Sequence, residues 1–573
     1  MLAALVVAAT AVAIAALRLR KSLAVSTLLI ALGVAIVVTW RQLPPLSYDW
    51  LPSIHVIFAE RGDGISRYAA TLVAAIAGIV AIYAFGDPET NEDAPRFFTT
   101  YALFVAAMLA FVAASSVSFA YVCWEVMGVA SFVLIGHAVG DVEAGRSARR
   151  AFTTTRIGDL AVLIGAVLLS RGSTPLGASF LVVGAAVKSA QLGASPWLVG
   201  AMVAPTPVSA LLHSATLVAA GPYLVARFVP LSSVPGVAMS LLIYAAISAL
   251  AAAIFAATSD DAKRTLAWSS IEQLAQAFVA AAVGMPLLAL GVLAGHAIAK
   301  PALFFAAGMQ RIATGTSRYG AASRSSRRVT AFVGAIAYGG IALVGIPPFV
   351  SSWALADTWT AVGSLQPALT LVGIALAALG GWYVARFALL LMPEHDRPFD
   401  ARHIGTGASV AVWLMCAAGI GISLAFRRGT VDAASVALPV AALVGAGACI
   451  AFRDGQLVRR PPLFANGITA WDLSFSRLTL ALSGTLDIID RGLLTGSDGL
   501  GAGILAAGAR ANIADRAIDR GTTVVGNDIV AGGKRAGSLV AGDASRYLAV
   551  SGAVFVAAAL AAVLLVLAMK GLV

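Results

Sequence analysis

The sequence has little charge for its length. Charged residues make up 12% of its 573 residues, hydrophobic residues make up 60%, and the mean hydropathy is +0.89. A soluble domain needs far more polar surface than this composition provides. Alternating strands of about ten residues are also absent, which argues against a membrane barrel. We therefore predict an all-α polytopic membrane protein.

Motifs of several enzyme classes are missing as well. The three cysteines, Cys123, Cys416 and Cys449, lie in apolar runs without a CxxC or Cys/His spacing, so we predict neither disulfides nor a metal site. There is no Walker loop, no GxGxxG motif after a strand and no hydrolytic triad. We predict no cofactor and no catalytic site in this chain. The net charge of +11 is better explained by arginines in cytoplasmic loops than by nucleic-acid binding.

Apolar runs recur along the chain, each long enough to cross a hydrocarbon core of ~30 Å as a helix. The first has no basic residues before it, so we expect a membrane helix rather than a signal peptide. Most basic loops fall between odd and even spans, and the positive-inside rule then predicts both termini outside a plasma membrane, with Arg427 and Arg428 as exceptions. The sixteen predicted spans are 1–17, 23–40, 68–86, 98–117, 119–139, 154–170, 176–199, 207–228, 236–258, 264–284, 286–310, 329–352, 366–391, 407–426, 434–452 and 548–569.

Glycine and proline interrupt two of these spans, the seventh around residues 193–196 and the twelfth around 345–348. Paired broken helices in corresponding positions indicate two inverted five-span repeats. Residues 454–547 show apolar residues at helical spacing and predict a lateral amphipathic segment on the cytoplasmic face, with a disordered linker as the alternative. The predicted parts are N-terminal helices 1–97, repeats 98–228 and 236–392, C-terminal helices 407–452, the amphipathic segment 454–547 and a last helix 548–573.

Only six of the 39 basic residues are lysines, and two of these, Lys188 and Lys300, lie inside apolar runs. An ammonium group loses its proton readily when desolvated, whereas guanidinium stays charged. A proton relay needs a group that can be both charged and neutral, so we predict this role for both; snorkelling near a helix end is the alternative. Lys263 and Glu272 lie near the start of the tenth span, where Lys263 is equally well explained as an interface lysine.

Two carboxylates accompany Lys188 within the predicted spans. Glu125 is the obvious counter-charge, because an intramembrane carboxylate usually faces a partner or a wet cavity. Asp159 follows Arg156 by three residues, so the two can pair on one helix face. Asp159 either modulates the site or only neutralises the arginine.

Two histidines also lie in apolar runs. His213 follows Ser209 by four residues, and His296 precedes Lys300 by four, so each pair shares a helix face. Because histidine accepts and donates protons through different nitrogens, both are candidates for a horizontal relay. The alternative is a satisfied core histidine.

Six segments follow one another in an order that resembles a known family: WEVMGVASFVLIG, RRAFTTTRIGDLAVLIG, KSAQLGASPWLVGAMVAPTPVSALLHSATLVAAGPYLVAR, DDAKRTLAWSS, HAIAKPALFFAAG and GIPPF. Together they resemble the antiporter-like proton-channel subunits of respiratory complex I, a family shared with Mrp cation/proton antiporters and membrane-bound hydrogenases. The resemblance covers about residues 60–390, and the tail looks like that of subunit L. It implies two inverted five-helix repeats, each a half-channel. It also implies that Glu125 pairs with Lys188, and that Asp159, His213, His296 and Lys300 occupy family positions.

The sequence departs from the family pattern mainly in the second repeat. After GIPPF the family carries a lysine or glutamate, whereas here Leu355 stands near that position and Asp357 is the only charge. A family histidine four residues before His296 is Val292, and the seventh-span PxHxWLPDAM pattern reads GASPWLVGAM. Either Asp357 substitutes for the lysine, or the exit half-channel is altered or closed. Glu272, where a small polar residue is common, could compensate.

We therefore predict a proton-translocating membrane subunit of a redox-driven, multi-subunit complex, such as a complex I-like NADH-quinone oxidoreductase, a hydrogenase or an Mrp-type relative. Quinone and NADH chemistry would belong to partner subunits, and no nucleic acid is implicated. One alternative is a proton-coupling subunit of an inorganic-carbon uptake system. Another is a structural subunit with a degenerate channel.

Overall fold

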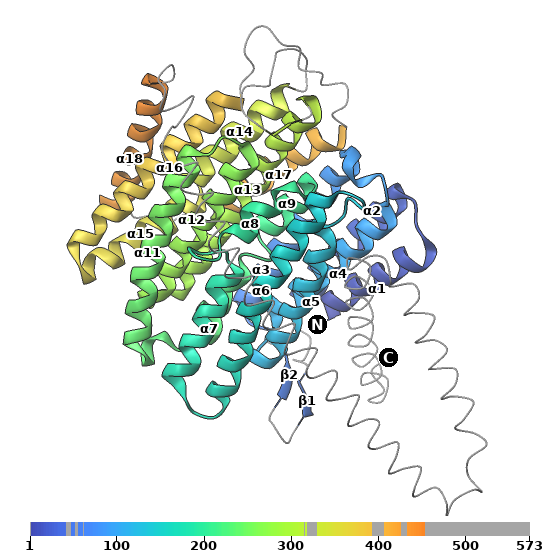
Figure 1. The fold of residues 1–573 in the computed structure, drawn as a ribbon, viewed down its shortest axis with the longest axis horizontal. Coiled ribbons are helices and arrows are strands. Elements are labelled where there is room, and N and C mark those ends of the chain that lie inside the picture. The colour runs from blue at the N-terminus through green and yellow to red at the C-terminus, as the bar shows by residue number, and fades with distance from the viewer. Residues whose placement is uncertain are drawn as a thin grey trace, which may run out of the picture. The chain divides into compact units, whose positions relative to one another are not determined.

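The structure is a computed structural model that describes residues 2–41, 47–51, 56–60, 62–314, 316–317, 329–391, 406–425 and 433–452. These residues are mostly helical, and they lie within one compact unit, residues 1–473 (Figure 1). The predicted amphipathic segment 454–547, the last helix 548–573 and the arginine-rich loop 318–328 lie outside the described residues.

Helices and one hairpin account for nearly all of the described chain. In the first half they are α1 (Leu2–Leu17), α2 (Lys21–Trp40), β1 (Ser47–Leu51), β2 (Val56–Ala59), α3 (Gly64–Gly86), α4 (Ala94–Ala113), α5 (Val117–Ile135), α6 (Val142–Ser170), α7 (Thr174–Lys188), α8 (Pro196–Gly200), α9 (Thr206–His213) and α10 (Ala220–Phe228). The second half contains α11 (Pro235–Thr258), α12 (Ala262–Ala282), α13 (Pro286–Thr314), α14 (Val329–Leu343), α15 (Val350–Leu365), α16 (Thr370–Leu391), α17 (Thr406–Ala425) and α18 (Ala433–Ala451). Short 3₁₀ turns join them: η2 (Pro88–Thr90), η3 (Ala201–Val203), η4 (Leu231–Ser233) and η5 (Pro367–Leu369).

Nine of the described helices are long and apolar enough to cross a membrane, and four shorter apolar helices accompany them. This confirms the prediction of a polytopic helical membrane protein. α12 is not among the nine, because its buried face carries glutamate, glutamines and serines. It is nevertheless buried almost all round, and it contacts α8, α10, α11, α13, α15 and α16. Several buried polar residues thus share one enclosed helix.

Both predicted helix breaks are present. The seventh span divides into α7 and α8 around Gly193, whose φ of +96° favours glycine, and the twelfth divides into α14 and α15 around Gly345, whose φ is +73°. The twelfth span is longer than predicted, because α15 continues to Leu365. A third break was not predicted: the eighth span stops at His213 and resumes as α10 at Ala220.

Side-chain caps set the start of several helices. A carboxylate or hydroxyl accepts a hydrogen bond from a first-turn backbone amide before α3, α4, α5, α6 and α12, which satisfies one of the amides that a helix leaves unpaired. The capping residues are Asp63, Asp93, Ser116, Asp141 and Asp261.

The β1–β2 hairpin between the second and third spans was not predicted. The strands pair antiparallel, with Ser47 opposite Ala59. The Ser115 amide donates to the Ala59 carbonyl at 2.8 Å, and Glu60 forms a bridge with Ala114. The hairpin is therefore tied to the connection between α4 and α5.

Candidate functional site

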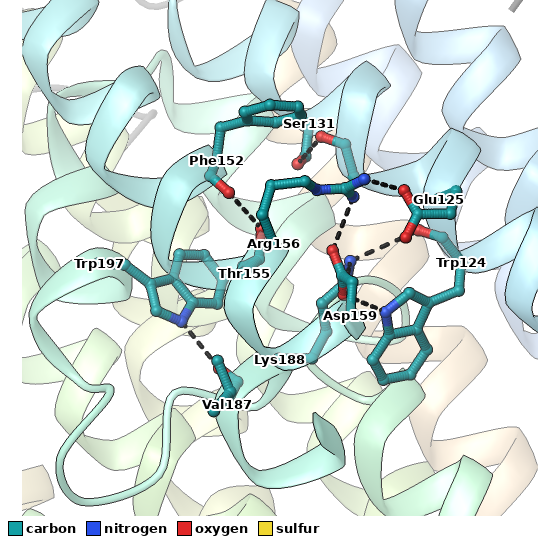
Figure 2. A network of polar contacts seen from close by, with 11 residues as sticks. Trp124, Glu125, Ser131, Phe152, Thr155, Arg156, Asp159, Val187, Lys188 and Trp197 are labelled. Carbon is teal, nitrogen blue, oxygen red and sulfur yellow. Dashed lines mark hydrogen bonds and ion pairs between the residues drawn. The ribbon is translucent and has the colours of Figure 1, made fainter. Parts of the chain in front are cut away.

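Four charged side chains from three helices form a partly buried cluster in the first half of the chain (Figure 2). The Arg156 guanidinium lies between two carboxylates: its Nη1 pairs with Glu125 of α5, and its Nη2 pairs with Asp159 Oδ2 at 2.6 Å. The other Asp159 oxygen lies 3.3 Å from the Lys188 ammonium nitrogen. Two cations and two carboxylates therefore neutralise one another at the end of α7.

Trp124 completes the surroundings of Lys188. Its indole N–H donates to Asp159 Oδ1, its carbonyl oxygen lies 3.4 Å from Lys188 Nζ, and its ring centroid lies 4.8 Å from the same nitrogen. An ammonium group over an aromatic face is stabilised electrostatically. Since Lys188 is fully buried, these contacts replace the water that a charged lysine would otherwise have.

The structure corrects one pairing that the family resemblance implied. Lys188 pairs with Asp159, and Glu125 pairs with Arg156, so the arginine lies between Glu125 and Asp159 (Figure 2). The predicted Arg156–Asp159 pair is confirmed. Helical spacing predicts Arg156 only as the partner of Asp159, because such spacing reveals pairs within one helix but not which partner a neighbouring helix presents.

Glycines bring these helices close enough for the cluster to form. A Cβ on Gly184 of α7 would lie 2.5 Å from the Gly158 carbonyl of α6, and one on Gly165 would lie 2.9 Å from the Gly177 carbonyl. Such backbone approach is possible only for very small residues, as at many membrane-helix interfaces. Gly128 of α5 makes room for the two cations, since a Cβ there would lie 2.6 Å from Arg156 Nη2 and 3.3 Å from Lys188 Nζ.

The polar groups at the break after α7 form hydrogen bonds with residues of the second half. The Leu192 amide donates to Ser248 Oγ at 3.0 Å, and the Tyr244 hydroxyl donates to the Leu192 carbonyl at 2.7 Å. Gln191 donates from Nε2 to the Ile271 carbonyl of α12 at 3.3 Å. Unwound backbone within a membrane needs such partners, and here they link Lys188's helix to α11 and α12.

Both predicted histidines lie at the centre of the described bundle, where α9, α12 and α13 meet. His213 Nδ1 lies 3.3 Å from Ser270 Oγ, and His296 Nε2 lies 2.6 Å from the His213 carbonyl. That carbonyl is free to receive the contact because the eighth span breaks after His213. The remaining nitrogens, His213 Nε2 and His296 Nδ1, have no hydrogen-bond partner among the described residues. Each leaves a position where a proton or water could attach.

Lys300 is held by α12. Its ammonium donates to the Leu266 carbonyl at 2.9 Å and to the Ser269 hydroxyl, and no carboxylate of the described residues lies within ion-pair distance. Pro301 follows it inside α13. Lys300 is thus fully buried, like Lys188, but is surrounded by neutral acceptors.

Glu272 is a buried carboxylate with neutral donors. It accepts from Gln276 Nε2, from Gln273 Nε2 at 3.0 Å and from the Tyr383 hydroxyl at 3.1 Å. Trp359 extends the cluster by donating to Gln276 Oε1 at 2.9 Å.

A cavity of about 20 Å³, enough for about one water molecule, adjoins Glu272 at the α14–α15 break. Leu355 lines this cavity together with Ser352 and Gln273. Leu355, the position at which the resemblance implies a lysine, therefore lines the same cavity as Glu272.

Asp357 and Lys263 lie away from that cavity. Asp357 is half-buried and lines an apolar groove of about 620 Å³ between α3, α10, α13 and α15. The idea that it replaces the family lysine beside Glu272 is therefore not supported by its position. Lys263 is buried at the start of α12 and donates to the Met202 and Ala204 carbonyls, at 3.2 and 2.7 Å.

Several polar residues that contact these ionisable groups were not predicted from the sequence. Ser269, Ser270 and Gln276 lie on α12, the helix that carries Lys263 and Glu272, so their position along that helix is a signal in the sequence. Trp124, Trp359 and Tyr383 reach their partners from other helices, and spacing along one helix does not indicate such contacts. Among the described residues there is no group of three or more His, Cys, Asp or Glu that could hold a metal ion.

Comparison with known proteins identifies the chain's relatives. Residues 114–176 and 171–380 match the family described as NADH:quinone oxidoreductase/Mrp antiporter, transmembrane. The chain is 31% identical over 407 residues to NADH-quinone oxidoreductase subunit L of Mycobacterium tuberculosis, covering 65% of this chain and 64% of that protein. It is also 31% identical over 410 residues to the chloroplast NAD(P)H-quinone oxidoreductase subunit 5 of Anthoceros angustus, covering 64% and 55%.

A solved structure shares the fold. A chain of the Mrp complex from Dietzia sp. DQ12-45-1b superposes with a TM-score of 0.69 at 22% identity, covering 95% of this chain and 63% of that one. At this identity the likeness establishes the fold alone. The chain spans less than two thirds of the length of each of these three relatives.

Proposed function

We propose that this chain, whose residues 114–380 match the NADH:quinone oxidoreductase/Mrp antiporter transmembrane family, is a proton-translocating membrane subunit of a multi-subunit complex. Its relatives by sequence are subunits of quinone oxidoreductases. The observation that carries the proposal is the series of buried ionisable groups from Lys188 through His213 to Lys300 and Glu272. Inside a membrane such groups are costly and mark ion or proton pathways.

The first station of the proposed path is the Lys188 cluster. With Lys188 protonated, the cluster holds two positive and two negative charges, and loss of that proton leaves one net negative charge. This negative charge attracts the next proton. Displacement of Glu125 would free Arg156 to bind Asp159 more closely, which would weaken the hold of Asp159 on the lysine. Glu125 would thereby control proton release through Arg156.

The central station consists of His213, Lys300 and the two α12 serines that contact them. The serine hydroxyls can donate and accept, so they can carry a proton between a lysine and a histidine. Glu272 is the last ionisable group of the proposed path and takes the place of the family lysine beside Leu355. Redox chemistry, where the complex performs it, would belong to partner subunits.

Substitution of Lys188 tests the proposal directly. The complex that co-purifies with a tagged chain is identified, reconstituted in liposomes and driven by its own reaction or ion gradient, and proton movement is followed with a pH-sensitive dye. Lys188→Ala should abolish translocation while assembly is retained, and Lys188→Met should do the same without leaving a cavity. Arg171→Ala removes an exposed cation of the α6–α7 turn and should have no effect. Normal translocation by assembled Lys188 variants would refute the proposal.

A second candidate, a structural subunit with a degenerate channel, is favoured by one observation. Leu355 is buried beside Glu272 where the family carries an ionisable residue. A Lys188/Lys300 double variant that assembles and leaves proton transport by the whole complex unchanged would support it.

The subunits that co-purify also decide between a redox complex and an inorganic-carbon uptake system. The placement of both termini outside a plasma membrane remains part of the proposal, to be tested by labelling of cysteines added near Leu2.

A further inference from the structure

The small cavity at the α14–α15 break brings three polar residues together. Glu272, Gln273 and Ser352 line it, and each of them is at most 4% exposed. Its volume is about 20 Å³. A cavity needs about 10–15 Å³ to hold one water molecule, so this one has room for a single water.

Two of these residues keep a buried polar atom without a partner. Gln273 Oε1 and Ser352 Oγ have no hydrogen-bond partner among the described residues. Burial of an unpaired amide oxygen or hydroxyl is costly, and ordered water is the usual partner of such groups. Two unpaired oxygens beside one cavity therefore indicate a molecule that hydrogen-bonds to both.

The contacts of Glu272 fix the orientation of the neighbouring amides. Gln273 Nε2 donates to Glu272 Oε2 at 3.0 Å, so a flipped amide would place its carbonyl oxygen against the carboxylate. Gln276 donates from Nε2 to Glu272 Oε1, while its own Oε1 accepts from the Trp359 indole at 2.9 Å. Both atoms of the Gln276 amide are thus engaged, and Gln273 Oε1 is the amide atom that still needs a donor.

A single water molecule matches the groups around the cavity. Its two O–H groups can donate to Gln273 Oε1 and to the Glu272 carboxylate, and its oxygen can accept from the Ser352 hydroxyl. Three hydrogen bonds are typical of a buried water. Leu355, which also lines the cavity, offers no competing polar group.

We propose that this cavity binds one water molecule, and that this water is the proton partner of Glu272, with Gln273 and Ser352 as positioning residues. When Glu272 releases a proton, the O–H bond of its carboxyl group breaks and a third O–H bond forms on the water, which leaves a carboxylate and a hydronium ion. The reverse step protonates Glu272. This inference rests on the proposed function, in which Glu272 is the last ionisable group of the path. In the competing explanation the cavity is dry, and Glu272 only anchors α12 to α16.

Gly380 of α16 also lines the cavity and allows a test that leaves every hydrogen-bonding side chain in place. A Cβ at this position would lie 3.7 Å from Val344 Cγ1 and 3.9 Å from the Tyr383 hydroxyl oxygen, which is ordinary contact. The methyl group of Gly380→Ala therefore takes the space of the water without a clash, and alanine suits a helix interior.

The proposal predicts that Gly380→Ala impairs translocation without impairing the fold. A methyl group cannot carry a proton, and a positioned proton-transfer group contributes about 10²–10⁴-fold to many reactions. Initial rates of proton translocation by the intact complex in liposomes should fall on the order of tenfold or more. Assembly should be retained, and the thermal unfolding midpoint should be unchanged or higher. A dry cavity predicts wild-type rates instead.

Three further variants complete the series. Gly421→Ala in α17 is the matched control, because its Cβ would meet nothing within 4 Å, and it should translocate normally. Ser352→Ala removes the donor to the water and should lower the rate, whereas Ser352→Thr keeps a hydroxyl and should retain most of it. Equal rates in the two Ser352 variants would overturn the positioning role of this hydroxyl.

A cryo-EM map of the complex, at a resolution that shows buried water, tests the site itself. We expect density for one water between Glu272, Gln273 and Ser352, and its loss in Gly380→Ala. A map that shows other buried waters but none here would overturn the inference. Wild-type translocation by an assembled Gly380→Ala complex would overturn it as well.

The same liposomes distinguish this inference from the proposed function. If Lys188→Ala is inactive while Gly380→Ala is normal, only the role of the water fails. Normal translocation by Lys188→Ala would instead remove the proposed function, and the proton-transfer role of the water with it.

Discussion

The two halves of the chain handle buried charge in different ways. In the first half, Lys188 and Arg156 are matched by two carboxylates within one cluster. In the second half, Lys300 and Glu272 are each surrounded by neutral hydrogen-bonding groups, and no ion pair among the described residues includes either. The first arrangement is neutral as a unit and loses its balance when one member changes. In the second arrangement, neutral hydrogen-bonding dipoles stabilise each charged group. Either group can therefore gain or lose a proton without leaving an oppositely charged partner unpaired.

The largest expected effect follows from breaking the first arrangement. Arg156→Ala leaves Glu125 without its cation, and removal of one partner of a buried pair typically costs about 3–5 kcal/mol. We expect a loss of this order, reduced because the arginine side chain is 30% exposed, in the free energy of unfolding measured by denaturant titration of the purified complex.

A double-variant cycle provides the control for this prediction. Glu125→Gln combined with Arg156→Gln removes both charges at once and should recover much of the stability lost in the single variants. A single Arg156→Ala variant as stable as the wild type would show that the cluster does not act as a unit.

The second half should respond in the opposite way. Glu272→Gln keeps a side chain that can hydrogen-bond to Gln276 and Tyr383 and removes a buried charge, so we expect unchanged or higher stability. Translocation should nevertheless fall on the order of tenfold or more, because the amide cannot carry a proton. Glu125→Gln, measured beside it, should instead destabilise the complex, because Arg156 loses one of its two carboxylate partners.

Leu355→Lys sharpens the same contrast. A lysine at this position would face Glu272 across the cavity at the α14–α15 break, so the variant should assemble when Glu272 is present. Combined with Glu272→Gln it should assemble poorly, since the new charge would then be unpaired. Equal assembly of the two variants would show that Leu355 and Glu272 do not share a site.

The smallest expected effect concerns the packing that brings the first cluster together. Gly184→Ala places a methyl group 2.5 Å from the Gly158 carbonyl, and overpacking of this kind typically costs about 1–3 kcal/mol. Gly33→Ala in α2 is a matched control, because its Cβ would meet nothing within 4 Å and a helix interior favours alanine. Thermal unfolding midpoints of the two variants provide the measurement; a Gly184→Ala midpoint equal to that of the wild type would contradict the close α6–α7 contact.

The sequence by itself determined the helical membrane class and which ionisable residues lie inside the helical bundle. Hydropathy and glycine or proline breaks are local properties, so the helical membrane class, the breaks near Gly193 and Gly345 and the burial of Lys188 and Lys300 could be predicted. The break after His213 could not, because no glycine or proline lies between Ser214 and Ala219.

Only the tertiary structure decided which of these groups meet. Whether Lys188 pairs with Glu125 or Asp159 depends on how α5, α6 and α7 are rotated against one another, and side-chain spacing along one helix carries no such information. For the same reason Leu355, rather than the charged Asp357 two residues later, lines the cavity beside Glu272. Two residues along a helix point to different sides, and only the packing of α15 against its neighbours determines which side borders this cavity.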